Sequence, residues 1–258
     1  MTRKPRGISK TGIYHIMLRG INHCHLFEES ADFTKFLGIL NRLKTNHPVR
    51  IVAFCLMDNH VHLLLREQSP GIVSKAMHSL LTQYASWFNN KYQRSGTLFA
   101  NRFKSECVES DKYLLSVLKY IHLNPVRAGI AEKPGSYQWS SYRVILQNTT
   151  SLVDTQYVLG LFANVNTEAR ARFSAFHKYE DNNEIDLLDD HQTVRKTDVE
   201  IRQEILPNLL DGINPNMIVG LPKPQRNDLI RRLRDNGLST RQIERITGIS
   251  RGVISRCV

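Results

Sequence analysis

Residues 49–66 read VRIVAFCLMDNHVHLLLR, and this stretch determines the fold of the first half of the chain. Two runs, 49–57 and 60–66, are rich in β-branched and other apolar residues, which are typical of strands. The pair Asp58-Asn59 between them is a turn signal. The stretch therefore predicts a β-hairpin.

Strands and helices alternate on both sides of this hairpin. Pro125 ends the last helix of the series near Asn124, because the residue before a proline disfavours the α conformation. Hydrophobic spacing and cap residues predict a strand at 14–18, a helix capped by Ser30, a helix from Ser69-Pro70 to about Tyr92, a strand at 102–108, and a helix capped by Ser110 or Asp111.

The order β-α-β-β-α-β-α with hairpin-joined central strands predicts an α+β fold. We expect a ferredoxin-like (RRM-like) antiparallel sheet with packed helices. Near the C-terminus, three short amphipathic segments separated by Gly-containing turns predict a small all-α helix-turn-helix domain. A helical hairpin that only packs against the first domain is the alternative. The expected division is 1–146 for the first domain, 147–220 for a partly helical acidic connection, and 221–258 for the helix-turn-helix.

Charge points to a polyanionic partner. The 258 residues carry 35 Lys and Arg against 24 Asp and Glu, a net charge of +11. Residues 1–146 hold 20 basic and 9 acidic side chains, and residues 221–258 hold 9 and 3. Residues 147–220 hold 6 basic and 12 acidic ones. Two basic blocks separated by an acidic one favour two contacts with a nucleic acid, although an anionic membrane surface also fits the net charge.

The compartment follows from cysteine use and hydropathy. The four cysteines form no C-x-x-C pair, which disfavours a zinc ribbon or a disulfide framework and suits a reducing environment. No apolar run reaches the roughly 18 residues of a membrane span, and no apolar segment follows the basic N-terminus. We therefore expect a cytoplasmic, nucleoid-associated protein with no membrane partner.

Four residues could carry chemistry. His60 and His62 stand two apart on a predicted strand, so their imidazoles face the same side and could bind one divalent cation. Tyr120 and Asn124 stand four apart on a predicted helix, hence on one face. A phenol oxygen can act as a nucleophile, and an amide oxygen suits Mg²⁺ or Mn²⁺. The alternatives are surface histidines, a half-buried core tyrosine and an asparagine that ends the helix.

These residues lie within motifs that resemble a known family. MDNHVHLLL around His60 and His62, together with KYIHLNPVRAG around Tyr120 and Asn124, is similar to the HUH single-tyrosine transposases (the IS200-like group). The similarity is closest to the REP-associated tyrosine transposases of bacteria, where REP denotes a repetitive extragenic palindrome. Further matches are YHIMLRGINH at 14–23, GTLFANRFKSECVES at 96–110 and YQWSSY at 137–142.

The resemblance implies an enzyme that cleaves and transfers single-stranded DNA at hairpins. It assigns the nucleophile to Tyr120, which would form a 5′-phosphotyrosine, and the Mg²⁺ or Mn²⁺ ligands to His60, His62 and Asn124. The sequence departs from related insertion-sequence transposases at Asn124, where a Gln often stands. A non-cleaving DNA-binding regulator that recognises the same hairpins is the rival reading, and an RNA-directed protein is a third.

DNA contacts are expected from two parts of the chain. Basic residues inside the family-like motifs would bind phosphates of the REP-like hairpin, and the helix-turn-helix would bind duplex DNA. Both a monomer and a homodimer are compatible with the sequence. The candidate contacts are Arg19, Arg102, Lys104 and Arg127 in the first domain, and Thr240, Arg241, Gln242, Arg251, Ser255 and Arg256 in the second.

Overall fold

A computed structural model of the chain describes residues 6–147, 152–178, 206–210, 213–236, 238, 240–254 and 257. The chain divides into two compact units, Met1–Asp189 and Asp190–Val258. Within the described ranges, every helix is too short or too polar to cross a membrane. Each unit has its own hydrophobic core.

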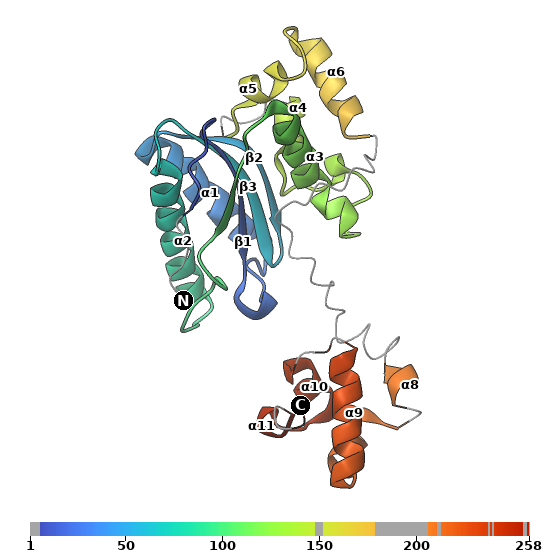
Figure 1. The fold of residues 1–258 in the computed structure, drawn as a ribbon. Helices are drawn as coiled ribbons and strands as arrows, with labels where there is room; N and C mark the ends of the chain where they lie inside the picture. The colour runs from blue at the N-terminus through green and yellow to red at the C-terminus, as the bar shows by residue number, and fades with distance from the viewer. Residues whose placement is uncertain are drawn as a thin grey trace. The chain divides into compact units, whose positions relative to one another are not determined.

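The first unit is built on a four-stranded antiparallel sheet with the strand order β2-β3-β1-β4 (Figure 1). This is the order of the ferredoxin-like fold, so the predicted fold class is confirmed. The predicted hairpin is present, because β2 and β3 pair from Met57 opposite His60 onward. The strands are β1 (Ile13–Arg19), β2 (Val49–Met57), β3 (His60–Glu67) and β4 (Lys104–Cys107).

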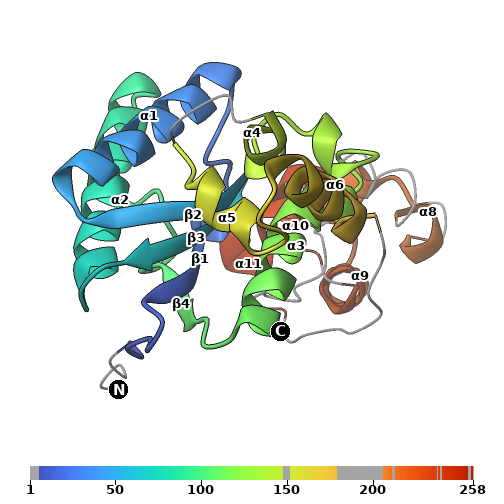
Figure 2. The ribbon, with the colours of Figure 1, turned by 90° about the horizontal axis from the view of Figure 1, so that it is seen from above.

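Helices cover both faces of this sheet. Two long helices lie against one face, and a third long helix with shorter ones lies on the other (Figure 2). Alternation along the strands explains the two layers, because Val61, Leu63 and Leu65 face the first pair while His60 and His62 face the third helix. The helices are α1 (Ser30–Asn46), α2 (Ile72–Lys91), α3 (Asp111–Arg127), α4 (Ser141–Gln147), α5 (Thr155–Gly160) and α6 (Asn166–Phe176).

The end of α3 differs from the sequence-based expectation. The helix does not stop near Asn124 but continues through Pro125 to Arg127. A proline lacks the N–H that would bond to the carbonyl four residues earlier, so it removes one hydrogen bond. The missing hydrogen bond lies in the last turn of the helix. Helical hydrogen bonding resumes after the proline, since the Ala128 N–H donates to the Asn124 carbonyl at 3.0 Å.

The start of α1 also differs from the expectation. Glu29, not Ser30, is the N-cap, and its side chain accepts from the N–H of Asp32 while the Asp32 carboxylate accepts from the N–H of Glu29. This reciprocal pair satisfies two helix-end donors, which a serine at position 30 could not do alone. The cap of α3 is as predicted, because the Ser110 hydroxyl accepts from the N–H of Tyr113.

The free edge of β2 is closed by the segment that follows α3. The Leu56 N–H donates to the carbonyl of Trp139, and the Phe54 N–H donates to the hydroxyl of Ser141. Further along, the N–H of Asp154 donates to the carbonyl of Ile51. Residues 152–178, expected to belong to a connecting region, contain α5 and α6 and add Leu152, Val158 and Phe173 to the core of the first unit.

The described residues of the second unit form helices and the turns between them. Its core is formed by buried leucines and isoleucines from three helices, including Leu233, Ile243 and Ile254. Gly248, at φ +72°, lies in the turn between the last two helices, where an L side chain would be strained. The described elements are α8 (Leu206–Leu209), η4 (Pro215–Gly220), α9 (Lys223–Asp235), α10 (Thr240–Thr247) and α11 (Arg251–Ile254).

A close backbone contact at Gly20 supports the turn of the hairpin. The Gly20 N–H donates to the Asn59 carbonyl at 2.9 Å, and a Cβ at position 20 would lie 2.1 Å from the Cys24 carbonyl oxygen. We expect Gly20→Ala to lower the free energy of unfolding by about 3 kcal/mol, the upper end for overpacked sites. Urea unfolding measures this. Gly38→Ala in α1 is the matched control, because that site has no atom within 4 Å, and equal stability of the two variants would contradict the prediction.

Candidate metal and nucleophile site

Two histidines at the start of β3 form one side of the site. His60 is half-buried and His62 is fully buried, and both side chains face α3. Their rings lie 5.1 Å apart between centroids and are nearly perpendicular, at 89°. The pairing of β3 with β2 and β1 fixes this arrangement, since His62 stands between Cys55 and Met17 in the central part of the sheet.

Helix α3 brings the other side of the site to these histidines. Its apolar residues Leu114, Val117, Leu118 and Ile121 are buried, which fixes the rotation of the helix on the sheet. The Asn124 amide then lies between the two imidazoles. Its Oδ1 is 3.2 Å from His60 Nε2, and its Nδ2 is 3.3 Å from His62 Nε2.

The far nitrogen of each imidazole is held by a second residue. His60 Nδ1 lies 2.8 Å from Asn59 Oδ1, to which it donates, and His62 Nδ1 lies 3.1 Å from His15 Nε2. Burial lowers the pKa of His62 well below its usual range, and the nearby His60, His15 and Arg19 add to this effect. A neutral imidazole that donates from Nδ1 presents a lone pair at Nε2. Both Nε2 atoms are turned toward the Asn124 amide.

This donor set fits a divalent cation. Two imidazole nitrogens and one amide oxygen, which lie within hydrogen-bonding distance of one another, are ligand types that Mn²⁺ accepts in proteins. Two ligands about 2.1 Å from one Mg²⁺ at a right angle are about 3.0 Å apart, close to the 3.2 Å between His60 Nε2 and Asn124 Oδ1. Within the described ranges no three His, Cys, Asp or Glu side chains gather as a metal site, and the third polar group beside the two imidazoles is the Asn124 amide.

Tyr120 lies one helical turn before Asn124, and its ring packs against His62 and His15. Its ring centroid is 5.3 Å from that of His62 and 6.0 Å from that of His15, both edge-on. The guanidinium carbon of Arg127 lies 5.3 Å from the Tyr120 ring centroid. The side chain is 5% exposed. A phenol, two imidazoles and an amide therefore converge on one side of the sheet.

Comparison with known proteins finds a matching family over the segment that holds these residues. Residues 9–124, which include all four residues, match the family described as "Transposase IS200 like". Over these residues the first unit is similar to the IS200-like transposases.

Two relatives extend the match. The chain is 27% identical over 156 residues to a protein of Haemophilus influenzae named as a REP-associated tyrosine transposase, over 55% of this chain and 86% of the relative. Its fold is similar to the structure of a REP-associated tyrosine transposase bound to a REP hairpin, with a TM-score of 0.50 and 15% identity. That match covers 59% of this chain and 90% of the other. The family resemblance seen in the sequence is confirmed.

The DNA contacts predicted in the first unit lie partly around this site. Arg19 ends β1 opposite His60, and Lys104 pairs with Met17, so both stand on the strand positions that face α3. Arg127 is on α3 beside Tyr120. Arg102 lies in the exposed loop before β4, where its charge lowers the pKa of Arg6, after a larger effect of burial.

The predicted contacts of the second unit are only partly described. Thr240 and Arg241 begin α10, and Arg251 begins α11. Gln242, on α10, is 7% exposed. The remaining two, Ser255 and Arg256, lie outside the described residues.

His15 and Asn59 are the site residues that sequence reasoning did not assign. The alternation of β1 could have placed His15 on the same face as Met17, but its partner in β3 depends on strand register. Asn59 was read as a turn residue, and its side chain also holds His60.

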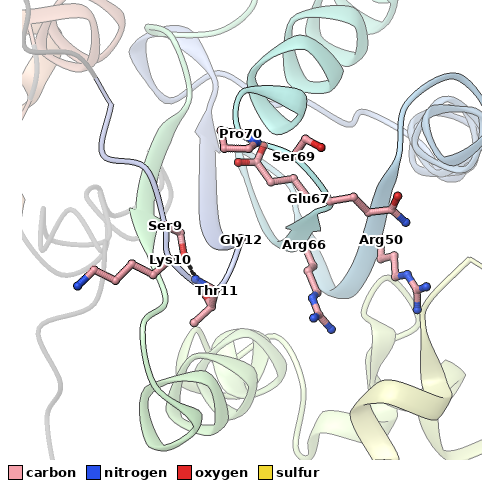
Figure 3. Close-up of a pocket in the computed structure, with 10 residues that line it drawn as sticks. Ser9, Lys10, Thr11, Gly12, Arg50, Arg66, Glu67, Ser69 and Pro70 are labelled. Atoms are coloured by element: carbon pink, nitrogen blue, oxygen red, sulfur yellow. Dashed lines mark hydrogen bonds between the residues drawn. The ribbon is translucent and has the colours of Figure 1, made fainter.

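A pocket of about 460 Å³ lies apart from this site, at the opposite end of β1 and β3 (Figure 3). Its two arginines contact the N-cap and the first turn of α5. Arg50 forms a 2.8 Å ion pair with Asp154, and the guanidinium of Arg66 lies over the ring of Tyr157. The pocket is lined by Ser9, Lys10, Thr11, Gly12, Arg50, Arg66, Glu67, Gln68, Ser69 and Pro70.

Proposed function

We propose that the protein is a metal-dependent endonuclease and strand transferase of single-stranded DNA that bears a REP-like hairpin. The observation that carries the proposal is the convergence of both histidine Nε2 atoms on the Asn124 amide, one helical turn from Tyr120. His60, His62 and Asn124 would hold Mg²⁺ or Mn²⁺. Three protein ligands leave coordination positions open for phosphate oxygens, whose charge the cation would neutralise.

The proposed reaction uses the phenol of Tyr120 as its nucleophile. The Tyr120 oxygen attacks the phosphorus of the scissile phosphodiester and loses its proton to solvent. The bond from phosphorus to the 3′ oxygen breaks, and that oxygen takes a proton from water. The products are a 5′-phosphotyrosine and a free 3′-hydroxyl. Attack by another 3′-hydroxyl reverses the step and joins a new strand, so the bond energy is kept and no nucleotide hydrolysis is required.

The two units would divide DNA recognition between them. We propose residues 1–146 as the nuclease domain and 221–258 as a helix-turn-helix that contacts duplex DNA, with 147–220 between them. The relative of similar fold was solved with a REP hairpin, which supports a hairpin substrate here. The basic residues Arg19, Lys104 and Arg127 would neutralise phosphates near the cleavage site.

A covalent-adduct assay tests this function. The full chain is incubated with labelled single-stranded REP-like hairpins and Mn²⁺ or Mg²⁺ and is run on a denaturing gel. We expect a slow-migrating protein–DNA band that a chelator abolishes and that an RNA hairpin of the same sequence does not form. Tight binding of the DNA hairpin with neither adduct nor cleavage would contradict the proposal and favour a non-cleaving regulator.

His15 provides a separate test of the metal site. Outer partners of metal-binding histidines typically contribute 10- to 100-fold in affinity. We expect His15→Phe, which keeps a ring against His62 but removes its acceptor, to weaken Mn²⁺ binding by about 30-fold. Calorimetric titration measures this. The exposed His25→Phe is the control, and equal Mn²⁺ affinity of the two variants would count against the role of His15.

A further inference from the structure

A second, buried polar cluster lies on the opposite side of α3 from the site. His122 is two residues from both Tyr120 and Asn124, so its side chain points away from the metal ligands. Its Nδ1 lies 2.9 Å from His177 Nε2, and its Nε2 lies 2.7 Å from the Ser141 hydroxyl. All three side chains of this His122–His177–Ser141 cluster are buried.

The direction of each hydrogen bond in the cluster can be assigned. Both imidazoles are buried, which favours the neutral form of each, and burial lowers the pKa of His177 to about 4. His177 Nδ1 donates to the Phe173 carbonyl at 2.8 Å, which leaves its Nε2 as an acceptor from His122 Nδ1. His122 Nε2 then accepts from the Ser141 hydroxyl, which itself accepts from the Phe54 N–H at 2.9 Å.

This chain of bonds joins four elements. It runs from α6 through α3 to α4 and ends on the backbone of β2 at Phe54. The next residue, Cys55, is the cross-strand partner of His62. The cluster therefore connects the helix that carries Tyr120 and Asn124 to the strand beside the histidine pair.

The cluster is also tightly enclosed. The ring of His122 meets Tyr142 edge-on at 5.6 Å and Phe173 at 5.7 Å, and His177 packs 4.4 Å from Phe173. Enclosed hydrogen bonds of fixed direction resist rotation of the helix, because a turn about its axis would leave buried polar atoms unsatisfied.

We propose that His177, His122 and Ser141 are positioning residues that fix the rotation of α3, so that Tyr120 and Asn124 meet the His60–His62 pair. The inference rests on the proposed function. A rotation of α3 by about 10° moves a side-chain tip by roughly 1 Å. A misplacement of about 1 Å can lower a catalytic rate by about 100-fold. Ser141 and His177 lie beyond residues 9–124, so a segment outside the family match would complete the active site.

Two variants that remove only hydrogen bonds test this role. His177→Phe keeps the ring volume but leaves His122 Nδ1 without its acceptor, and Ser141→Ala removes the hydroxyl. We expect each to lower kcat for hairpin cleavage by about 10- to 100-fold, with KM for the hairpin within about twofold of wild type. The Kd for Mn²⁺ should rise about 10-fold. It is measured at a temperature at which thermal melts show that every variant is folded.

Matched controls separate positioning from stability. Phe173→Leu reduces packing around His177 but keeps the carbonyl that accepts from it, and Ser141→Thr keeps the hydroxyl. Both should retain kcat. In an Asn124→Ala background, His177→Phe should have no further effect on Mn²⁺ affinity. If His177→Phe and Phe173→Leu show the same kcat and Mn²⁺ Kd when fully folded, the positioning role is excluded.

A wild-type protein that binds no Mn²⁺ would count against the proposed metal function and not against the positioning role. Amide hydrogen exchange of α3 then decides the positioning role by itself. We expect exchange over α3 to be about 10-fold faster in His177→Phe than in Phe173→Leu. Equal exchange in the two variants would overturn the inference.

Discussion

Tyr120→Phe is expected to abolish the covalent DNA adduct and to lower cleavage by about 10⁴-fold or more, as loss of a nucleophile does in other enzymes. The phenylalanine ring can keep the contacts with His62, His15 and Arg127, since all of these involve the ring of Tyr120. Only the attacking oxygen is lost. Adduct formation on a denaturing gel and hairpin affinity at fixed salt measure the two properties separately.

The control for this variant comes from the same helix. Tyr113→Phe removes a hydroxyl from α3 at a site seven residues before Tyr120 and should leave adduct formation unchanged. An adduct of normal yield in Tyr120→Phe would assign the nucleophile to another residue. Loss of hairpin binding in the same variant would show that Tyr120 contributes to recognition. The adduct assay would then have to be carried out at a saturating DNA concentration.

The second large effect is expected for His60→Ala. His60 is half-buried at the start of β3, so its removal should disturb folding less than removal of the fully buried His62. Loss of one of the three proposed protein ligands should weaken Mn²⁺ binding by more than about 100-fold, the upper range for outer partners. Cleavage at low Mn²⁺ should fall by about 10³-fold, comparable to loss of a key electrostatic group.

Metal concentration distinguishes this defect from misfolding. Because the His60→Ala variant binds Mn²⁺ weakly but keeps Tyr120, the proposed nucleophile, excess Mn²⁺ should restore part of the cleavage rate. The exposed His78→Ala on α2 is the matched control and should cleave normally. A His60→Ala protein with wild-type Mn²⁺ affinity would exclude the proposed metal site, and chelator-resistant cleavage by wild type would exclude metal dependence.

Local periodicity explains why so much of this architecture could be predicted. The spacing of His60 and His62 along a strand, and of Tyr120 and Asn124 along a helix, depends only on the geometry of the element. The hairpin of β2 and β3 is equally local, since its strands and turn are continuous in sequence. The order of elements then restricted the sheet to a few topologies, of which the ferredoxin-like one is confirmed.

Non-local contacts account for what the sequence did not reveal. His15 reaches His62 across 47 residues, and His122 reaches His177 across 55, so each depends on the register or docking of separate elements. The continuation of α3 past Pro125 depends on tertiary packing that outweighs a local preference. Helices α4 and α5 are too short for a clear amphipathic pattern, and they become recognisable only against β2.

The cover over the edge of β2 also has a consequence for solubility. An unprotected edge strand can pair with another chain and seed aggregation, and β2 would be a strong candidate because Arg50 is its one exposed residue. Backbone and hydroxyl groups of Trp139, Ser141 and Asp154 occupy that edge. A recombinant fragment that ended at residue 124 would lose this protection, whereas a fragment extending to residue 178 would retain it.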